Sequence, residues 1–457
     1  MSNVIRIRKG LTLSLRGKAE KVVSKLPAAA YALKPGDFPY LTPRLTVGEG
    51  DAVLAGTPLF TDKYRPEIRY ASPVSGTVSA IVRGDKRRLL EVVVTPSAEQ
   101  EYVTHDAMDV AALSREAIIG RLLESGAWPF IRQRPFGMVA DPADTPKAIF
   151  ISGFDSAPLA PDTDFTLTGE AIAFQKGIDV LRRLTDKVYL CLNDETAATS
   201  IFHKITGVTK KVFRGPHPAG NVGVQIHHIS PINKGEKVWT IDPQHIVAIG
   251  RLALRGVYDV SKVVALAGPS VKRPRYFRTI AGAALSGIAG YVDMSGSRRY
   301  ISGNVLTGAN VGADGYLGFY DNSITVIPEG DTCEFLGWAN PLRLHRYSVS
   351  RSYLSWMFPR REYAPDANMN GGVRAFVVSG AYEKVLPMDI LPVYLLKAIL
   401  AGDIDRMEQL GIYEVVEEDF ALCEFVCPSK IPVQDIIRKG IALMVNEQLN
   451  NNTCYAR

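Results

Sequence analysis

The stretch Val47-Gly-Glu-Gly-Asp-Ala-Val-Leu-Ala-Gly-Thr-Pro-Leu-Phe60, followed by Ser72-Pro-Val-Ser-Gly-Thr-Val78, decides the fold of the first part of this chain. Both phrases are short apolar runs separated by glycine and proline, a composition typical of strands joined by tight turns. The same punctuation recurs at Lys34-Pro-Gly-Asp37 and Gly84-Asp85. The sequence therefore predicts an all-β module over residues 1–105.

The two phrases together resemble the halves of a barrel-sandwich hybrid of the lipoyl and biotinyl type. Carrier domains of that type modify a lysine in a Thr-Asp-Lys-like turn, and Thr61-Asp-Lys63 occupies a similar place here. Lys63 lies nine residues before Ser72, farther than in a presented carrier hairpin, and nothing else suggests a swinging-arm enzyme. We expect an unmodified structural barrel, with lipoylation or biotinylation of Lys63 as the alternative.

Helices and strands alternate over residues 106–258. Ser114 is placed to cap a helix, a second helix is predicted over residues 169–184, and strands are predicted over 148–152, 187–192 and 245–249. Alternating β and α units favour a largely parallel sheet with both faces covered. We therefore expect a Rossmann-like α/β domain.

The last two parts of the chain change pattern again. Short β segments at 263–267, 300–301 and 324–327 indicate a small mixed domain over residues 259–335. Helical spacing indicates a mainly helical domain over residues 336–457, with helices at 391–400, 404–410, 417–423 and 433–445. The predicted class is a multidomain α/β and α+β protein, as a chain of 457 residues favours.

Composition excludes several classes of protein. The net charge of +6, from 53 basic and 47 acidic residues, is too small for a nucleic-acid-binding footprint. No apolar run approaches the roughly 20 residues that cross a bilayer, and the first 13 residues lack a secretory signal. Five scattered cysteines indicate free thiols in a reducing compartment. We expect a cytoplasmic chain with no transmembrane segment and no nucleic-acid partner.

Three motifs resemble cofactor or metal sites, and each lacks a necessary part. The loop Gly153-Phe-Asp-Ser-Ala-Pro158 has neither of the glycine-rich phosphate patterns. Cys423-Glu-Phe-Val-Cys427-Pro428 looks like the end of an iron–sulfur motif, but two thiolates are too few, which leaves structural cysteines or a site shared with another chain. His227 and His228, if they lie on a strand, point to opposite faces, so no metal site is expected. Gly215-Pro-His-Pro-Ala-Gly220 is interpreted as a rigid loop that places His217 at an interface.

The stretch Trp128-Pro-Phe-Ile-Arg-Gln-Arg-Pro-Phe136 combines aromatic and guanidinium side chains. Aromatic faces with guanidinium donors suit a flat ring that carries carbonyl oxygens, such as a quinone head group. Interdomain packing, with the arginine stems along apolar surface, is the alternative. The candidate residues are Phe130, Arg132, Arg134 and Phe136.

Several phrases, in order along the whole chain, resemble the A-subunit family of the sodium-translocating NADH:quinone reductases. They are Ile5-Arg-Ile-Arg-Lys-Gly-Leu-Thr-Leu13, Ser72-Pro-Val-Ser-Gly76, Arg132-Gln-Arg-Pro-Phe136, Pro146-Lys-Ala-Ile-Phe150, Gly215-Pro-His-Pro-Ala-Gly220, Leu386-Pro-Met-Asp-Ile-Leu-Pro392 and Ala421-Leu-Cys-Glu-Phe-Val-Cys-Pro428. The family is also similar to the flavin subunit of respiratory complex I and to the C subunit of the Rnf complex. That relationship implies a β-grasp domain of the SLBB type over residues 259–335.

The resemblance implies a function. In that family a six-subunit complex passes electrons from NADH, through flavins and iron–sulfur centres in partner subunits, to ubiquinone or menaquinone, and pumps sodium. The A subunit is peripheral, on the cytoplasmic side of the bacterial inner membrane, docks on the membrane-embedded B subunit and is implicated in quinone binding. No cofactor and no catalytic residue are then expected in this chain.

Two departures from the flavin-binding relatives agree with that expectation. Their glycine-rich flavin loop is replaced here by Ser125-Gly-Ala-Trp-Pro-Phe130, and of their clustered cysteines only Cys423 and Cys427 remain. The leading hypothesis is a protein that helps form a quinone site, with Asp37, Phe38 and Tyr40 as a second wall beside residues 130–136. The alternatives are a ligand-free assembly module and a free-standing soluble flavin or lipoyl-type protein.

Overall fold

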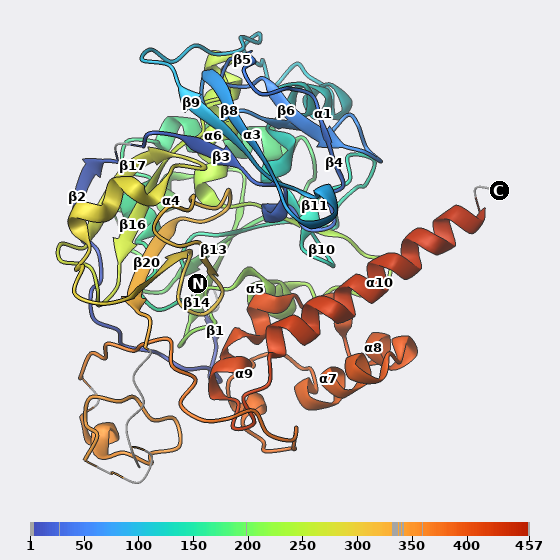
Figure 1. Cartoon of the computed structure of the whole chain (residues 1–457). Helices are drawn as coiled ribbons and strands as arrows, with labels where there is room; N and C mark the ends of the chain where they lie inside the picture. Colours follow the sequence, from blue (N-terminus) through green and yellow to red (C-terminus); the bar gives the residue numbers. More distant parts are fainter. Residues whose placement is uncertain are drawn as a thin grey trace.

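The computed structural model describes residues 4–26, 28–197, 199–330, 337, 340, 342–358 and 360–455. Two small β-sheets lie at the top of the view in Figure 1, two larger sheets lie in the middle, and the C-terminal helices lie below. The class predicted from the sequence, a multidomain α/β and α+β protein, is confirmed.

The N-terminal barrel consists of a four-stranded sheet, in the order β3-β9-β8-β5, and a three-stranded sheet, in the order β4-β6-β7. Their bounds are β3 Tyr31–Leu33, β4 Pro43–Leu45, β5 Ala52–Val53, β6 Pro58–Asp62, β7 Arg69–Ala71, β8 Gly76–Arg83 and β9 Leu89–Pro96. Gly76 begins β8 where a Cβ atom would lie 2.0 Å from the Thr95 carbonyl oxygen, so only glycine lets β8 and β9 meet there. The short turns η1 (Pro35–Asp37) and η2 (Asp85–Arg87) project from this barrel.

The α/β domain has a seven-stranded sheet in the order β1-β14-β13-β12-β15-β10-β11. Strands β1 (Ile5–Arg6), β12 (Ile149–Ser152), β13 (Val188–Asn193), β14 (Thr209–Arg214) and β15 (Val238–Thr240) are parallel, and β10 (Arg132–Arg134) and β11 (Met138–Val139) are antiparallel. Its helices are α1 Arg115–Glu124, η3 Trp128–Phe130, α2 Thr163–Thr166, α3 Ala171–Arg182, α4 Ile201–Lys204, α5 Val222–Ile229 and α6 Pro243–Arg255. Ser114 caps α1 as predicted, because its side chain accepts from the Ala117 amide.

The predicted strand over residues 245–249 is wrong, since these residues lie inside helix α6. Asp242 caps the helix by accepting from the Gln244 amide, Pro243 occupies its first turn, and Gly256 ends it in a left-handed conformation. The run looked like a strand because α6 is buried on nearly all sides. At Gly250 a Cβ atom would lie 1.7 Å from the Ala173 carbonyl oxygen of α3, so the two helix backbones touch.

The third domain has a six-stranded sheet in the order β19-β18-β20-β16-β17-β2. The strands are β2 Glu20–Lys25, β16 Ser261–Ala267, β17 Arg275–Ile280, β18 Arg298–Ser302, β19 Ala309–Asn310 and β20 Ser323–Pro328, with η4 at Leu285–Tyr291. Strand β2 pairs with β17, and β1 pairs with β14. The N-terminal segment thus supplies edge strands to two sheets outside the barrel.

The C-terminal region contains helices near the four predicted ranges, whereas the described residues of 342–391 are largely irregular. It contains η6 Leu354–Met357, η7 Tyr382–Lys384, α7 Pro392–Ala401, α8 Ile404–Gln409, η8 Ile412–Glu414, η9 Glu417–Phe420, α9 Ala421–Val426 and α10 Val433–Tyr455. These helices share a core with one face of the α/β sheet, including Phe150 and Phe213, whereas α3 and α6 cover the opposite face. Within the residues described, no helix is long and apolar enough to cross a membrane.

Candidate functional site

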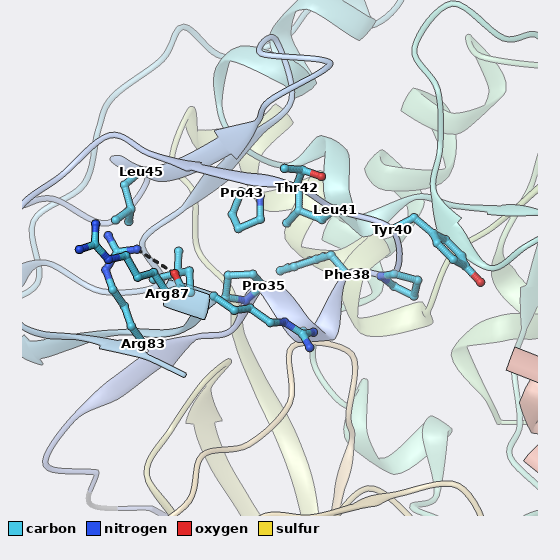
Figure 2. A pocket seen from close by; sticks show the side chains of 13 residues that line it. Pro35, Phe38, Tyr40, Leu41, Thr42, Pro43, Leu45, Arg83 and Arg87 are labelled. Atoms are coloured by element: carbon cyan, nitrogen blue, oxygen red, sulfur yellow. Dashed lines mark hydrogen bonds between the residues drawn. The ribbon is translucent and has the colours of Figure 1, made fainter. Parts of the chain in front are cut away.

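A groove of about 530 Å³ opens on the barrel beside the loop that was predicted as the second wall. It is lined by Pro35, Gly36, Phe38, Pro39, Tyr40, Leu41, Thr42, Pro43, Leu45, Arg83, Arg87, Arg88 and Leu89. Figure 2 shows Arg83 and Arg87 at one end of this groove and Tyr40 at the other. The groove therefore combines an apolar floor with a cationic end.

Buried contacts hold the floor of the groove in place. The Phe319 amide donates to Asp37 Oδ2 over 2.9 Å, and Lys34 Nζ lies 3.7 Å from Asp37 Oδ1. Burial raises the pKa of Asp37 to about 6, although Lys34 and the Phe319 amide act in the opposite direction. Asp37 thus fixes the loop to the third domain and leaves Phe38, which is 2% exposed, as the floor.

Tyr40 points away from this floor. Its backbone has a positive φ of 64°, and its side chain lies near Glu417 and Arg438 of the C-terminal region. Burial raises the pKa of the Tyr40 hydroxyl to about 12. Tyr40 therefore marks the end of the groove that faces the C-terminal helices (Figure 2).

An aromatic wall stands behind the groove and consists of Phe38, Phe130, His245, Phe319 and Tyr320. Ring centroids of Phe38 and Phe319 are 4.9 Å apart, and those of Phe319 and Phe130 are 5.6 Å apart. The His245 ring stacks on Phe130 at 4.7 Å, and its burial lowers its pKa well below the usual value. The wall thus joins the barrel, the α/β domain and the third domain.

A second opening, a crevice of about 190 Å³, lies on the other side of the aromatic wall. It is lined at the carboxyl ends of β12 and β15 by Ser152 and Thr240, and it also includes Arg132. From β12 the parallel strands run through β13 to β14 on one side, and β15 then lies on the other side of β12, so the strand order reverses between β12 and β15. Open α/β sheets bind ligands at such a position. Phe38 lines the groove and Arg132 lines the crevice, so Tyr320, which touches both, separates the two openings.

Charges in the crevice are mostly satisfied by the protein itself. Asp242 accepts from the Gln244 amide and from Asn322 Nδ2, and Asp155 accepts from the Ala157 amide. Burial raises the pKa of Asp155 to about 6. The Arg132 guanidinium lies 4.8 Å from the Tyr320 ring centroid and has no hydrogen-bond acceptor among the described residues.

Arg134 and Phe136 lie elsewhere, against the C-terminal helices. Arg134 donates to Asp419 Oδ2 over 2.7 Å and to Glu418 Oε1 over 2.5 Å, and its side chain is nearly inaccessible. Phe136 is buried and packs at 6.1 Å from the Tyr413 ring. For these two residues and for Phe130, the geometry favours the packing interpretation.

The histidines also lie away from the expected surroundings. His227 and His228 are in helix α5, not in a strand, and their rings hydrogen-bond to different groups, Glu414 Oε2 at 2.7 Å and the Val224 carbonyl at 2.9 Å. His217 is 6% exposed, lines the crevice and shares a 3.0 Å hydrogen bond with Ser156 Oγ. Burial lowers the pKa of His217 to about 4.

Cys423 and Cys427 are fully buried in the C-terminal helices. Tyr382 Oη donates to Cys427 Sγ over 2.9 Å, and burial raises the pKa of the Cys423 thiol. Within the described part of the chain, no three His, Cys, Asp or Glu side chains come together as metal ligands would. The two thiols therefore lie in an apolar core and not at an open surface.

The residues that connect the site were not predicted from the sequence. Phe319 and Tyr320 follow Gly315-Tyr-Leu-Gly318, and no local pattern there indicates contact with residues 38 and 130. Near the arginines of the β8–β9 turn, the sequence indicated only a turn at Gly84-Asp85. Their position beside Phe38 depends on the fold of the barrel.

These features define a class of protein: a barrel-sandwich hybrid with a groove on its surface, a Rossmann-like α/β domain with a crevice at its strand ends, an SLBB-type domain and a helical region. Three family models match the chain, described as NqrA N-terminal barrel-sandwich hybrid domain (residues 5–97), NqrA second alpha/beta domain (113–258) and NQRA C-terminal domain (263–313). The chain belongs to the family of the A subunit of the Na(+)-translocating NADH-quinone reductase.

Curated relatives of that name match nearly the whole chain. The protein from Yersinia pseudotuberculosis is 41% identical over 440 residues, which are 95% of this chain and 98% of the relative. The Rhodopirellula baltica protein is 40% identical over 453 residues, 97% of this chain and 99% of the relative. The Pseudomonas aeruginosa protein is 38% identical over 448 residues, 97% of this chain and 100% of the relative.

A solved structure of an NAD+-reducing [NiFe]-hydrogenase is also similar, at 12% identity and a TM-score of 0.36. The matched region covers 76% of this chain and 67% of the hydrogenase chain. A likeness this weak supports no conclusion about this chain.

Proposed function

We propose that this chain is the peripheral A subunit of a sodium-translocating NADH:quinone reductase and that its groove receives the quinone ring. Relatives of that name match 95–97% of the chain, which supports membership of the same multisubunit complex. The chain would dock on the membrane-embedded B subunit from the cytoplasmic side. The described residues contain no helix that could span the membrane, which is consistent with a peripheral place.

The groove carries the quinone part of the proposal. Its apolar floor at Phe38 suits one face of a flat ring, and its arginines suit the carbonyl oxygens. Reduction places negative charge on those oxygens, and guanidinium groups stabilise that charge more strongly than they stabilise the neutral quinone. Arg132, across the aromatic wall, has the same donor chemistry in the crevice and is the second place where a carbonyl group would fit.

We also propose that flavins and iron–sulfur centres reside in partner subunits, not in this chain. In place of a flavin loop stands Trp128, which is fully buried, donates to the Ala140 carbonyl over 2.7 Å and packs against Trp239. A bulky indole at this point leaves no room for the close backbone approach that a flavin phosphate needs. Cys423 and Cys427 provide only two thiolates, which are too few to hold an iron–sulfur cluster, and both side chains are packed inside an apolar core.

Photo-crosslinking in the assembled complex tests the quinone proposal. A photoreactive quinone analogue is expected to label residues 35–45 and 83–89, and excess quinone should compete with the labelling. Labelling confined to partner chains would remove the quinone role and leave the chain as an assembly module.

A groove-filling variant sharpens this test. Leu45→Trp places an indole at a half-buried position that lines the groove, and it is expected to abolish the competed labelling. Leu54→Trp adds the same side chain at an exposed position of the barrel outside the groove lining and should leave labelling unchanged.

A further inference from the structure

We propose that the β8–β9 turn, beside the mouth of the groove, docks on an anionic lipid bilayer. This inference rests on the proposed function, because a quinone whose tail stays in the membrane reaches the groove only if the groove opens towards the bilayer. It adds the surface that makes the contact and the lipid class that this surface recognises.

The turn is strongly basic and its charges are unpaired. Arg83-Gly-Asp-Lys-Arg-Arg88 carries four basic residues and one acidic residue. All four basic side chains are exposed, and among the described residues none forms an ion pair with a carboxylate. An exposed cluster of this kind is a binding surface for anionic groups, because its charges are not neutralised by the protein.

The backbone of the turn has a defined conformation that holds the four basic side chains close together. Lys86 and Arg87 both have positive φ, at 53° and 60°, and the turn is closed by the Gly84 amide, which donates to the Arg88 carbonyl over 2.9 Å. Arg83 Nη1 donates to the Arg87 carbonyl over 3.2 Å. The turn is therefore an ordered structure and not a loose charged loop.

Apolar side chains accompany the charges. Val82 and Leu90 flank the turn and are 38% and 40% exposed, and neither of them lines the groove. Basic groups next to exposed aliphatic groups match the boundary between lipid head groups and acyl chains. A nucleic acid would need a larger basic face than this chain has, with a net charge of only +6.

A lobe with exposed apolar side chains competes with this turn. The lobe of residues 342–358 exposes Leu342, Trp356 and Met357, and it also carries Arg351. In Figure 1 it projects at the lower left, whereas the barrel strands lie at the top. Because the groove is on the barrel and not on the lobe, we assign the bilayer contact to the turn.

Co-sedimentation of the full chain with vesicles tests this inference. The chain is expected to bind vesicles of phosphatidylcholine mixed with phosphatidylglycerol, and not vesicles of phosphatidylcholine alone, and binding should weaken as salt is added. Arg87→Gln with Arg88→Gln should reduce the partition coefficient roughly 25-fold, since each basic residue near an anionic surface contributes about fivefold. Arg360→Gln with Arg361→Gln removes the same charge beside the lobe and should leave binding unchanged.

Three outcomes would overturn the inference: no binding to either vesicle, equal binding to both, or a loss that follows the Arg360 and Arg361 change instead. The thermal unfolding midpoint of each variant shows whether the exposed substitutions leave the fold intact. Quinone labelling in detergent separates the two proposals. In the unaltered protein, an absence of competed labelling together with vesicle binding would refute the quinone site alone, and competed labelling without vesicle binding would refute the bilayer contact alone.

Discussion

His217 illustrates how a single buried residue links stability to pH. Its folded-state pKa, about 4, lies below the ordinary value of 6.5, because burial disfavours the charged ring. As the pH falls below 6.5, the unfolded chain takes up a proton that the folded chain refuses, so His217 costs stability in the window from 6.5 down to 4. Above that window both states are neutral and the residue makes no pH-dependent contribution.

The His217→Gln variant should therefore lose less stability on acidification than the parent chain. We expect the difference in unfolding free energy between the two to change by about 2 kcal/mol between roughly pH 7 and pH 5. Urea unfolding at several pH values measures it. A His203→Gln variant is the control, because His203 lies at a more exposed position. A constant difference between parent and His217→Gln would contradict the assignment.

Residue chemistry was partly predictable from the sequence. Phe38, Phe130 and Arg132 were selected for the right side-chain types, but as two separate walls. The structure brings them together through Phe319 and Tyr320, which lie far along the chain. The spacing of residues in a sequence indicates which side chains are neighbours on one helix or strand. Contacts between distant segments depend on tertiary packing, so the contacts of Phe319 and Tyr320 with these residues were not predictable.

At the scale of elements, the aromatic wall is the feature that holds three domains together. Phe319 contacts Phe38, Phe130, His245 and Tyr320, and it is only 4% exposed. Its truncation leaves a cavity whose lining comes from all three domains. Phe319→Ala should therefore lower the unfolding free energy by about 3–5 kcal/mol.

Urea unfolding followed by near-UV circular dichroism measures this effect, since the signal reports on packed aromatic rings. Tyr394→Ala removes an aromatic ring from an exposed position on α7 and should change the free energy of unfolding by less than about 0.5 kcal/mol. Equal midpoints for Phe319→Ala and the parent chain would show that the wall does not bear on stability.

Elements were predicted best where capping and turn residues agreed with periodicity. Ser114 begins α1, and the predicted helix at 169–184 corresponds to α3. The error at residues 245–249 arose because a short apolar run fits a buried strand and a buried helix equally well. Asp242 and Pro243 just before it are a helix start signal, and they decide the question in favour of α6.

At the scale of the whole molecule, the first 25 residues tie the domains together. Strand β1 lies at the edge of the α/β sheet, where the Ile7 amide donates to the Arg214 carbonyl over 2.8 Å. Leu13 and Leu15 pack against Tyr363 of the C-terminal region, and β2 then joins the sheet of the third domain. Such links over large sequence separations cannot be inferred from the short runs that form them.

A chain that lacks residues 1–16 should consequently expose the edge of β14 and the apolar surface around Ile7. Unpaired sheet edges promote aggregation, so we expect most of the shortened protein in the insoluble fraction. A synthetic peptide of residues 4–16, added during refolding, should restore solubility by pairing with β14. The same peptide with Ile7→Asp should fail, because it would bury an unpaired carboxylate where Ile7 is 4% exposed. If the shortened chain were soluble and unfolded at the parent's urea midpoint, the N-terminal segment would be an attachment to the sheet and not a part of its stability.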